Sequence, residues 1–159
     1  MRQTFDRRSV LGISALGICV GSAAGVALLA SGSPSHAATV TFKADLKGSS
    51  EVPPNQTTGT GSVTATFDPA TKELTYSGTF SGLTGPTMAA HFHGPAEAGK
   101  NAGVQIWISE KGKPIESPFK GTVKLTDAQA ADLMAGQWYV NLHTKANPGG
   151  EIRGQLVKS

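Results

Sequence analysis

The chain has 159 residues, a single cysteine and a formal net charge of +3. Residues 1–37 hold three of its 14 Lys and Arg side chains and one of its 11 Asp and Glu side chains, so residues 38–159 carry a net charge of only +1. This near-neutral segment gives no support for a nucleic-acid partner. Because the one cysteine is Cys19, disulfides and thiolate chemistry are excluded from residues 38–159.

The first 37 residues have the pattern of a twin-arginine (Tat) export signal. Arg7 and Arg8 precede an apolar run rich in Gly and Ala, residues 10–30, and small residues around Ala37 form a cleavage site. An uncleaved membrane anchor is the alternative, because about twenty apolar residues can span a bilayer. The interspersed glycines and the cleavage site favour removal after Ala37. We therefore expect a periplasmic or secreted protein with no stable membrane insertion after cleavage.

Residues 38–159 have the length of one domain with its own core, and apolar and polar side chains alternate along short segments of it. Such alternation is typical of half-buried β-strands. The segments 61–67 and 73–81 form a predicted hairpin around a turn at 68–72. The full set of predicted strands is 39–48, 61–67, 73–81, 87–93, 103–109, 119–125, 138–144 and 150–157.

One helix is predicted between the last strands. Thr126 and Gln129 have the spacing of a capping box, Leu133 and its neighbouring alanines favour helix, and Gly136 ends it. About eight short strands with glycine-rich connections and one short helix indicate an all-β fold, an antiparallel sandwich of two sheets.

Three of the four histidines lie outside the signal, at positions 91, 93 and 143. Side chains alternate along a strand, so His91 and His93 project to the same face. Met88, Ala90 and Phe92 form the opposite, core-facing set. A histidine pair at this spacing can grip a metal ion.

The predicted C-terminal hairpin brings His143 to a similar face. Pairing Leu142 with Ile152 buries both side chains and leaves residues 145–149 as the loop. In this register His143 faces Glu151. If the strands 87–93 and 138–144 are neighbours, the polar side chains expected on one outward sheet face are His91, His93, Asn141, His143, Glu151 and Arg153.

Several motifs go beyond this alternation. Residues 89–96 read AAHFHGPA, residues 139–144 read YVNLHT, and residues 150–154 read GEIRG. Together with FKADL at 42–46 and EVPP at 51–54, they resemble the CHRD (chordin-type) domain over essentially all of residues 38–159, as in exported bacterial members of that family.

The resemblance implies an immunoglobulin-like β-sandwich and much less about function. We expect a binding or structural module and not an enzyme. In chordin the domain occurs in a growth-factor-binding protein. This chain has one such unit and no cysteine-rich neighbouring modules, so that partner is not carried over. A protein partner outside the cytoplasm is expected, with no identity attached.

Three interpretations of the histidine face remain open. In the first, His91, His93 and His143 hold copper or zinc, which suit imidazole ligands, and Glu151 acts as an outer-sphere partner or an additional ligand. In the second, the histidines form hydrogen bonds that specify strand register. In the third, the domain is a copper-dependent enzyme like superoxide dismutase, because His91 and His93 have the spacing of the His-Xaa-His copper ligands of that enzyme.

Trp107 is predicted on the same side of its strand as Gln105, opposite Ile106. An outward tryptophan marks a binding patch, lies over the sheet edge or is covered by the helix. The sequence leaves these alternatives open.

Overall fold

The computed structural model describes residues 37–110 and 113–159. The predicted export signal, except Ala37, lies outside the described residues. The described residues form nine strands, a short helix α1 (Asp127–Met134) and a 3-10 turn η1 (Gly48–Ser50). The strands are β1 (Val40–Lys47), β2 (Thr60–Asp68), β3 (Glu73–Ser81), β4 (Thr87–His93), β5 (Val104–Trp107), β6 (Phe119–Lys124), β7 (Tyr139–Thr144), β8 (Ile152–Gln155) and β9 (Val157–Lys158).

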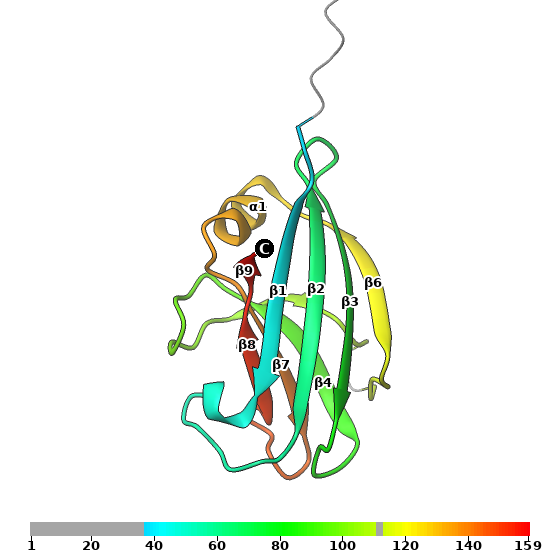
Figure 1. The fold of residues 1–159 in the computed structure, drawn as a ribbon, viewed down its shortest axis with the longest axis vertical. Helices are drawn as coiled ribbons and strands as arrows, with labels where there is room; N and C mark the ends of the chain where they lie inside the picture. Colours follow the sequence, from blue (N-terminus) through cyan, green and yellow to red (C-terminus); the bar gives the residue numbers. More distant parts are fainter. Residues whose placement is uncertain (1–36, 111–112) are drawn as a thin grey trace, which may run out of the picture. The chain divides into compact units, whose positions relative to one another are not determined.

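The strands form one antiparallel path in the order β5-β4-β7-β8-β1-β2-β3-β6, and β9 pairs with β1 beside β8. Figure 1 shows β1, β2, β3 and β6 side by side, with β4 and β7 behind them. The sheet therefore curls so that its two halves face each other as the layers of a sandwich. The predicted all-β sandwich with one short helix is confirmed.

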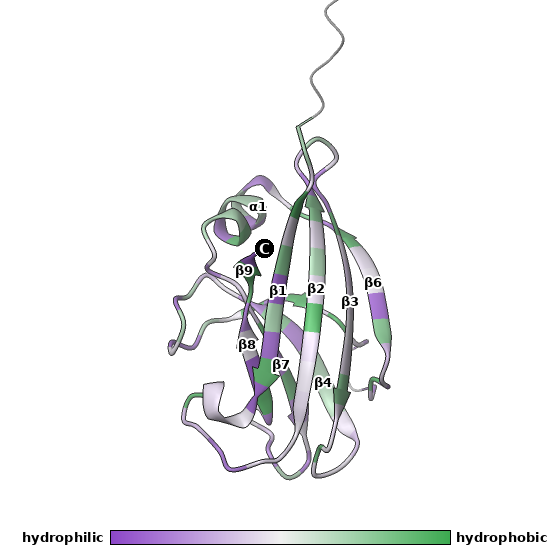
Figure 2. Cartoon of the chain, viewed as in Figure 1, coloured by the Kyte–Doolittle hydropathy of each residue, from purple (hydrophilic) through white to green (hydrophobic). Residues whose placement is uncertain are grey.

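The core lies between these two layers. Hydrophobic and hydrophilic residues alternate along β1 (Figure 2), and three of the hydrophobic ones, Phe42, Ala44 and Leu46, are buried. Across the sandwich, Tyr76 of β3 meets Phe92 of β4 edge to face, with ring centroids 5.0 Å apart. Such a pair adds to the free energy gained from burying its apolar area.

The eight predicted strand segments are all present, but the last one splits. Its residues form β8 and β9, because the Leu156 side chain is fully buried and its N–H donates to Trp138 O at 2.9 Å. Leu156 thus leaves the regular ladder of β8, and the chain continues against β1.

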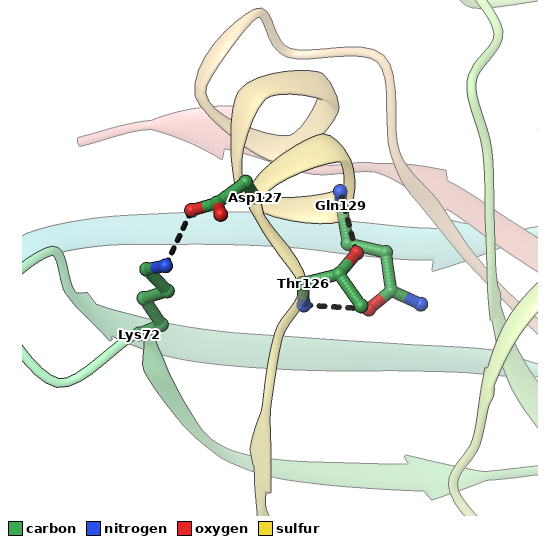
Figure 3. A network of polar contacts seen from close by, with 4 residues as sticks. All are labelled: Lys72, Thr126, Asp127 and Gln129. Atoms are coloured by element: carbon green, nitrogen blue, oxygen red, sulfur yellow. Dashed lines mark hydrogen bonds and ion pairs between the residues drawn. The ribbon is translucent and has the colours of Figure 1, made fainter.

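The predicted helix and both of its ends are confirmed. Thr126 and Gln129 form a reciprocal capping box, and Lys72 makes an ion pair with Asp127 in the first turn (Figure 3). After the helix, Gly136 has φ +74°, and Gln137 N–H donates to Asp132 O at 3.0 Å. This is the left-handed turn that glycine favours after a helix.

The two layers join where β8 passes β1. Lys47 is the partner of Arg153 in this pairing. Gly154 allows the close approach, because a Cβ there would overlap the Asp45 backbone. The junction places Arg153 at the boundary between the layers.

Strands β4, β7 and β8 are neighbours, as the site prediction required. Leu142 pairs with Ile152 and Asn141 with Arg153, so the predicted register of the hairpin is confirmed. Asn141 also pairs with His91 of β4. The register of β4 shifts between Thr87 and Ala89, however.

That irregularity corrects the expected position of Met88. Its side chain is 49% exposed, whereas Thr87 is buried. A bulge adds a residue to one strand and reverses the alternation before it. Ala90 and Phe92, beyond the bulge, are fully buried in the core as predicted.

Candidate metal centre

The three histidines come together on the sheet face opposite the core. His91 and His93 lie two residues apart in β4, and His143 lies in the adjacent strand β7. One ring nitrogen of each histidine lies within 4.8 Å of the corresponding nitrogen of both others. The predicted convergence of the three imidazoles is thus present in the structure.

Backbone carbonyls determine which nitrogen of His93 and His143 carries a proton. Nδ1 of His93 lies 3.0 Å from Ala102 O, and Nδ1 of His143 lies 2.9 Å from Pro148 O. A carbonyl only accepts hydrogen bonds, so each Nδ1 is the protonated donor and each Nε2 keeps its lone pair. A metal-binding histidine typically donates its other ring N–H in this way.

His91 completes the cluster. Its Nδ1 lies 3.2 Å from Nε2 of His143. Nε2 of His91 and Nε2 of His93 are both buried and have no hydrogen-bond partner among residues 37–110 and 113–159. A buried polar atom without a partner costs about 1–3 kcal/mol, and a bound ion would use such a lone pair.

All three imidazoles favour their neutral form. Burial, together with the adjacent His143 and His93, lowers the pKa of His91 to about 4. Burial also lowers the pKa values of His93 and His143, against the opposing effect of the carbonyls of Ala102 and Pro148. Neutral imidazole is the form that binds a metal.

The nitrogen separations can be compared with those around a bound ion. Two imidazole nitrogens at about 2.0–2.1 Å from a tetrahedral ion lie about 3.3–3.4 Å apart. The 3.2 Å distance between Nδ1 of His91 and Nε2 of His143 is a hydrogen bond between the two rings, and it is not a ligand separation for an ion bound by the free Nε2 of His91. The largest separation, 4.8 Å, requires an inward movement of somewhat more than about 1 Å.

Comparison with known proteins identifies the family. The family model described as the CHRD domain matches residues 42–156. The chain belongs to the CHRD family. No curated protein matches the chain, and no solved structure matches it. The resemblance stated from its motifs is confirmed, and membership supports a binding or structural module.

Much of the histidine face of this CHRD domain is closed to solvent, contrary to the sequence expectation, although His143 is only half-buried. His91 is 6% exposed, His93 9% and Arg153 2%. The residues between β4 and β5 cover them, because Ala102 O contacts His93 and Asn101 Oδ1 accepts from Arg153 at 2.8 Å. Strand alternation identifies the face of a side chain, but it carries no information about loops that fold over that face.

Glu151 does not join the histidines, which corrects its expected role as an outer-sphere partner or ligand. It precedes β8, after Gly150 at φ +137°, so strand alternation does not determine where its side chain points. Its fully buried carboxylate accepts hydrogen bonds from the hydroxyls of Thr57, Thr84 and Thr144 and from the Thr84 N–H. The histidines form no hydrogen bond with Glu151 among those of the described residues.

These threonines also control the charge of Glu151. Burial raises the pKa of its carboxyl, but the hydrogen bonds from Thr144, Thr57 and Thr84 outweigh burial and lower the pKa to about 2. Glu151 is therefore an ionised structural group of the CHRD domain that ties the C-terminal hairpin to the segments around Thr57 and Thr84.

A second polar network, missed by the sequence analysis, lies beside the histidines. Asn141 Nδ2 donates to both oxygens of the Glu51 carboxylate, at 2.8 and 2.9 Å. Burial raises the pKa of Glu51 to about 7, although Arg153 and Asn141 lower it. The sequence analysis named Glu51 only within the EVPP motif of the family resemblance. A loop residue that folds back over a sheet has no periodic pattern that would predict its position.

Arg153 and Tyr139 connect this network to His93. The guanidinium carbon of Arg153 lies 3.4 Å from the centroid of the Tyr139 ring, and the ring of His93 is parallel to Tyr139 at 4.9 Å. Tyr139 is in β7, between β4 and β8. Its ring therefore separates the His93 imidazole from the Arg153 guanidinium.

Trp107 lies over the edge of the histidine cluster. It is the partner of His91 in the β4–β5 pairing, and the two rings meet edge to face with centroids 4.2 Å apart. The Trp107 side chain is 43% exposed. Of the alternatives that the sequence left open, the structure shows an outward tryptophan at the sheet edge that contacts a histidine of the cluster.

Proposed function

We propose that this CHRD protein is a non-catalytic metal-binding module in which His91, His93 and His143 hold copper or zinc. The observation that carries the proposal is the pair of buried Nε2 atoms, on His91 and His93, that have no hydrogen-bond partner within the described part of the chain. For His93, the carbonyl of Ala102 directs the lone pair of Nε2 toward the cluster.

Hydrogen bonding for strand register alone does not account for these nitrogens. A register-specifying polar cluster gains stability by satisfying its buried groups. Here the Nε2 lone pairs of His91 and His93 are left unsatisfied within the described residues, while Nδ1 of His93 is held by the Ala102 carbonyl and Nδ1 of His91 by the ring of His143. Imidazole rings that are held in place while their lone pairs lack a hydrogen-bond donor are expected of a site that binds a ligand.

Metal titration of the purified protein tests the proposal. Calorimetry with Zn(II), and with Cu(II), should give one bound ion per chain. His93→Phe keeps an aromatic ring beside Tyr139 and removes both ring nitrogens, so it should abolish stoichiometric binding. Met88→Ala changes an exposed side chain of the same strand and should bind like the parent.

The unfolding midpoint provides an independent test. An ion that binds only the folded protein must stabilise it by mass action. The parent should therefore unfold at a higher temperature with metal present, and His93→Phe should show no such increase. Equal midpoints for the parent with and without metal would favour the register interpretation.

We further propose that the protein is exported by the twin-arginine route and works outside the cytoplasm. The support is the sequence of residues 1–37. No helix within the described residues has the length and apolar character needed to cross a membrane. Mass spectrometry of the protein recovered from outside the cytoplasm should find Ala38 as its first residue. Replacing both Arg7 and Arg8 by Lys should leave the precursor in the cytoplasm.

A further inference from the structure

The candidate ligands bring no negative charge to a bound ion. The three histidines are the complete metal-ligating group in this part of the described structure, and Glu151 is held elsewhere by threonines. Three neutral imidazoles leave the full charge of an ion in place. A divalent ion at this site would therefore keep a charge of about two units unless it bound an anion from solvent.

The nearest permanent charge is a cation. Arg153 is buried, and only the Tyr139 ring separates its guanidinium from the imidazole of His93. Arg153 is the charged side chain that lowers the pKa of His93, beside the mutual effect of the imidazoles themselves. Glu51 is bonded to Asn141, which is the strand partner of both His91 and Arg153.

Burial makes this charge arrangement costly for a divalent ion. The Born cost of removing an ion from water rises with the square of its charge, so it is about four times larger for a divalent than for a monovalent ion of equal size. The free nitrogens of His91 and His93 are out of contact with solvent. A neutralising hydroxide is therefore poorly placed to reach the ion.

The number of ligands points in the same direction. Zinc in proteins takes four ligands, and where the protein supplies three, as the described residues do here, water fills the fourth position, which burial of this site disfavours. Monovalent copper has a filled d shell and is satisfied by three nitrogen donors. We propose that the resident ion is monovalent copper, Cu(I), bound in preference to divalent ions because the pocket is neutral, buried and beside Arg153.

This inference rests on the proposed metal-binding function, and competition titrations separate the two. Cu(I) affinity is measured without oxygen, with excess ascorbate, against bicinchoninate, and Zn(II) affinity is measured against a chromophoric zinc chelator. The dissociation constant for Cu(I) should be lower than that for Zn(II) by at least about 100-fold. Equal affinities, or tighter zinc binding, would overturn the Cu(I) inference and leave the metal-binding function standing. Binding of neither ion would overturn both.

Two variants test the role of charge. Arg153→Gln removes the buried cation and should raise the affinity for Zn(II) more than that for Cu(I). The ratio of the Zn(II) to the Cu(I) dissociation constant should therefore fall. Glu51→Gln, measured at pH 8, removes the negative charge that faces Arg153 and should raise this ratio of dissociation constants. Circular dichroism establishes that each variant is folded. If Arg153→Gln does not fold, the result for Glu51→Gln alone tests the role of charge. An unchanged ratio of the Zn(II) to the Cu(I) dissociation constant in the folded variants contradicts the electrostatic argument.

Discussion

The rings of His93 and Tyr139 lie parallel, with an interplanar angle of 3° and centroids 4.9 Å apart. Both residues also contact Ala102. His93 Nδ1 donates to the Ala102 carbonyl, and the Ala102 N–H donates to the Tyr139 hydroxyl at 3.1 Å. Tyr139 thus holds His93 directly through its ring and indirectly through the Ala102 backbone.

Removal of the Tyr139 hydroxyl should weaken metal binding without unfolding the protein. Tyr139→Phe keeps the ring beside His93 and loses the contact with Ala102, which is then freer to move. Loss of an outer-sphere partner costs about 10- to 100-fold in metal affinity, and we expect the lower end, about tenfold. Stability should fall by only about 1 kcal/mol. Calorimetric titration and thermal unfolding check both values, and unchanged affinity would contradict the role of Ala102.

Trp107 should report copper binding. Its ring contacts His91, whereas Trp138 is fully buried and packs with Phe92 in the core. Cu(II) quenches a nearby indole, so titration with Cu(II) should reduce the tryptophan fluorescence to a saturating level. In Trp107→Phe most of the quenching should be absent, because Trp138 is on the other side of the sheet. Equal quenching in parent and variant would mean that copper binds elsewhere.

Glu51 should destabilise the protein at alkaline pH. The pKa of its carboxyl is raised from 4.5 to about 7, so its contribution to stability is fully present below pH 4.5 and is lost as the pH rises through 7. Glu51→Gln keeps an acceptor for Asn141 without the charge. It should gain up to about 3 kcal/mol over the parent at pH 8 and almost nothing at pH 4. Denaturant unfolding at both pH values provides the measurement, and a variant less stable at pH 8 would exclude the predicted effect.

Glu151 should have the opposite pH dependence. Its folded-state pKa of about 2 lies below its ordinary value of 4.5, so its contribution is present above pH 4.5 and is lost as the pH falls through 2. Glu151→Gln should therefore cost about 3 kcal/mol at pH 7, and this difference should shrink in acid. Glu97→Gln, at an exposed position, is the matched control and should change stability little. A difference that stayed constant across the pH range would contradict stabilisation of the ionised carboxylate by the threonine hydroxyls.

Much of this architecture follows from local patterns in the sequence. Alternation of apolar side chains located the strands, the Thr126 and Gln129 pair located the helix start, and burial of Leu142 and Ile152 determined the register of the C-terminal hairpin. These features depend on neighbouring residues or on one hairpin. The convergence of His91, His93 and His143 followed from them once β4 and β7 were taken as neighbours.

The errors arise where the backbone departs from regular alternation or where distant segments meet. A bulge exposes Met88, and the turn at Gly150 precedes Glu151. The loop that carries Asn101 and Ala102 buries Arg153 and His93. Such long-range contacts depend on loop paths, which have no period in the sequence. The buried environment of the candidate centre was therefore accessible only from the structure.

The β4–β7 pairing also has a consequence for the kinetics of folding. His91 and His143 are 52 residues apart in the chain, so their approach requires closure of a long loop. Non-local pairings of this kind form slowly. An ion that needs both strands can bind only after they have met, and its stabilisation is then absent from the earlier transition state. Metal should accordingly slow unfolding and leave the folding rate almost unchanged, so that the loaded protein would resist denaturation chiefly through a longer lifetime of its native state.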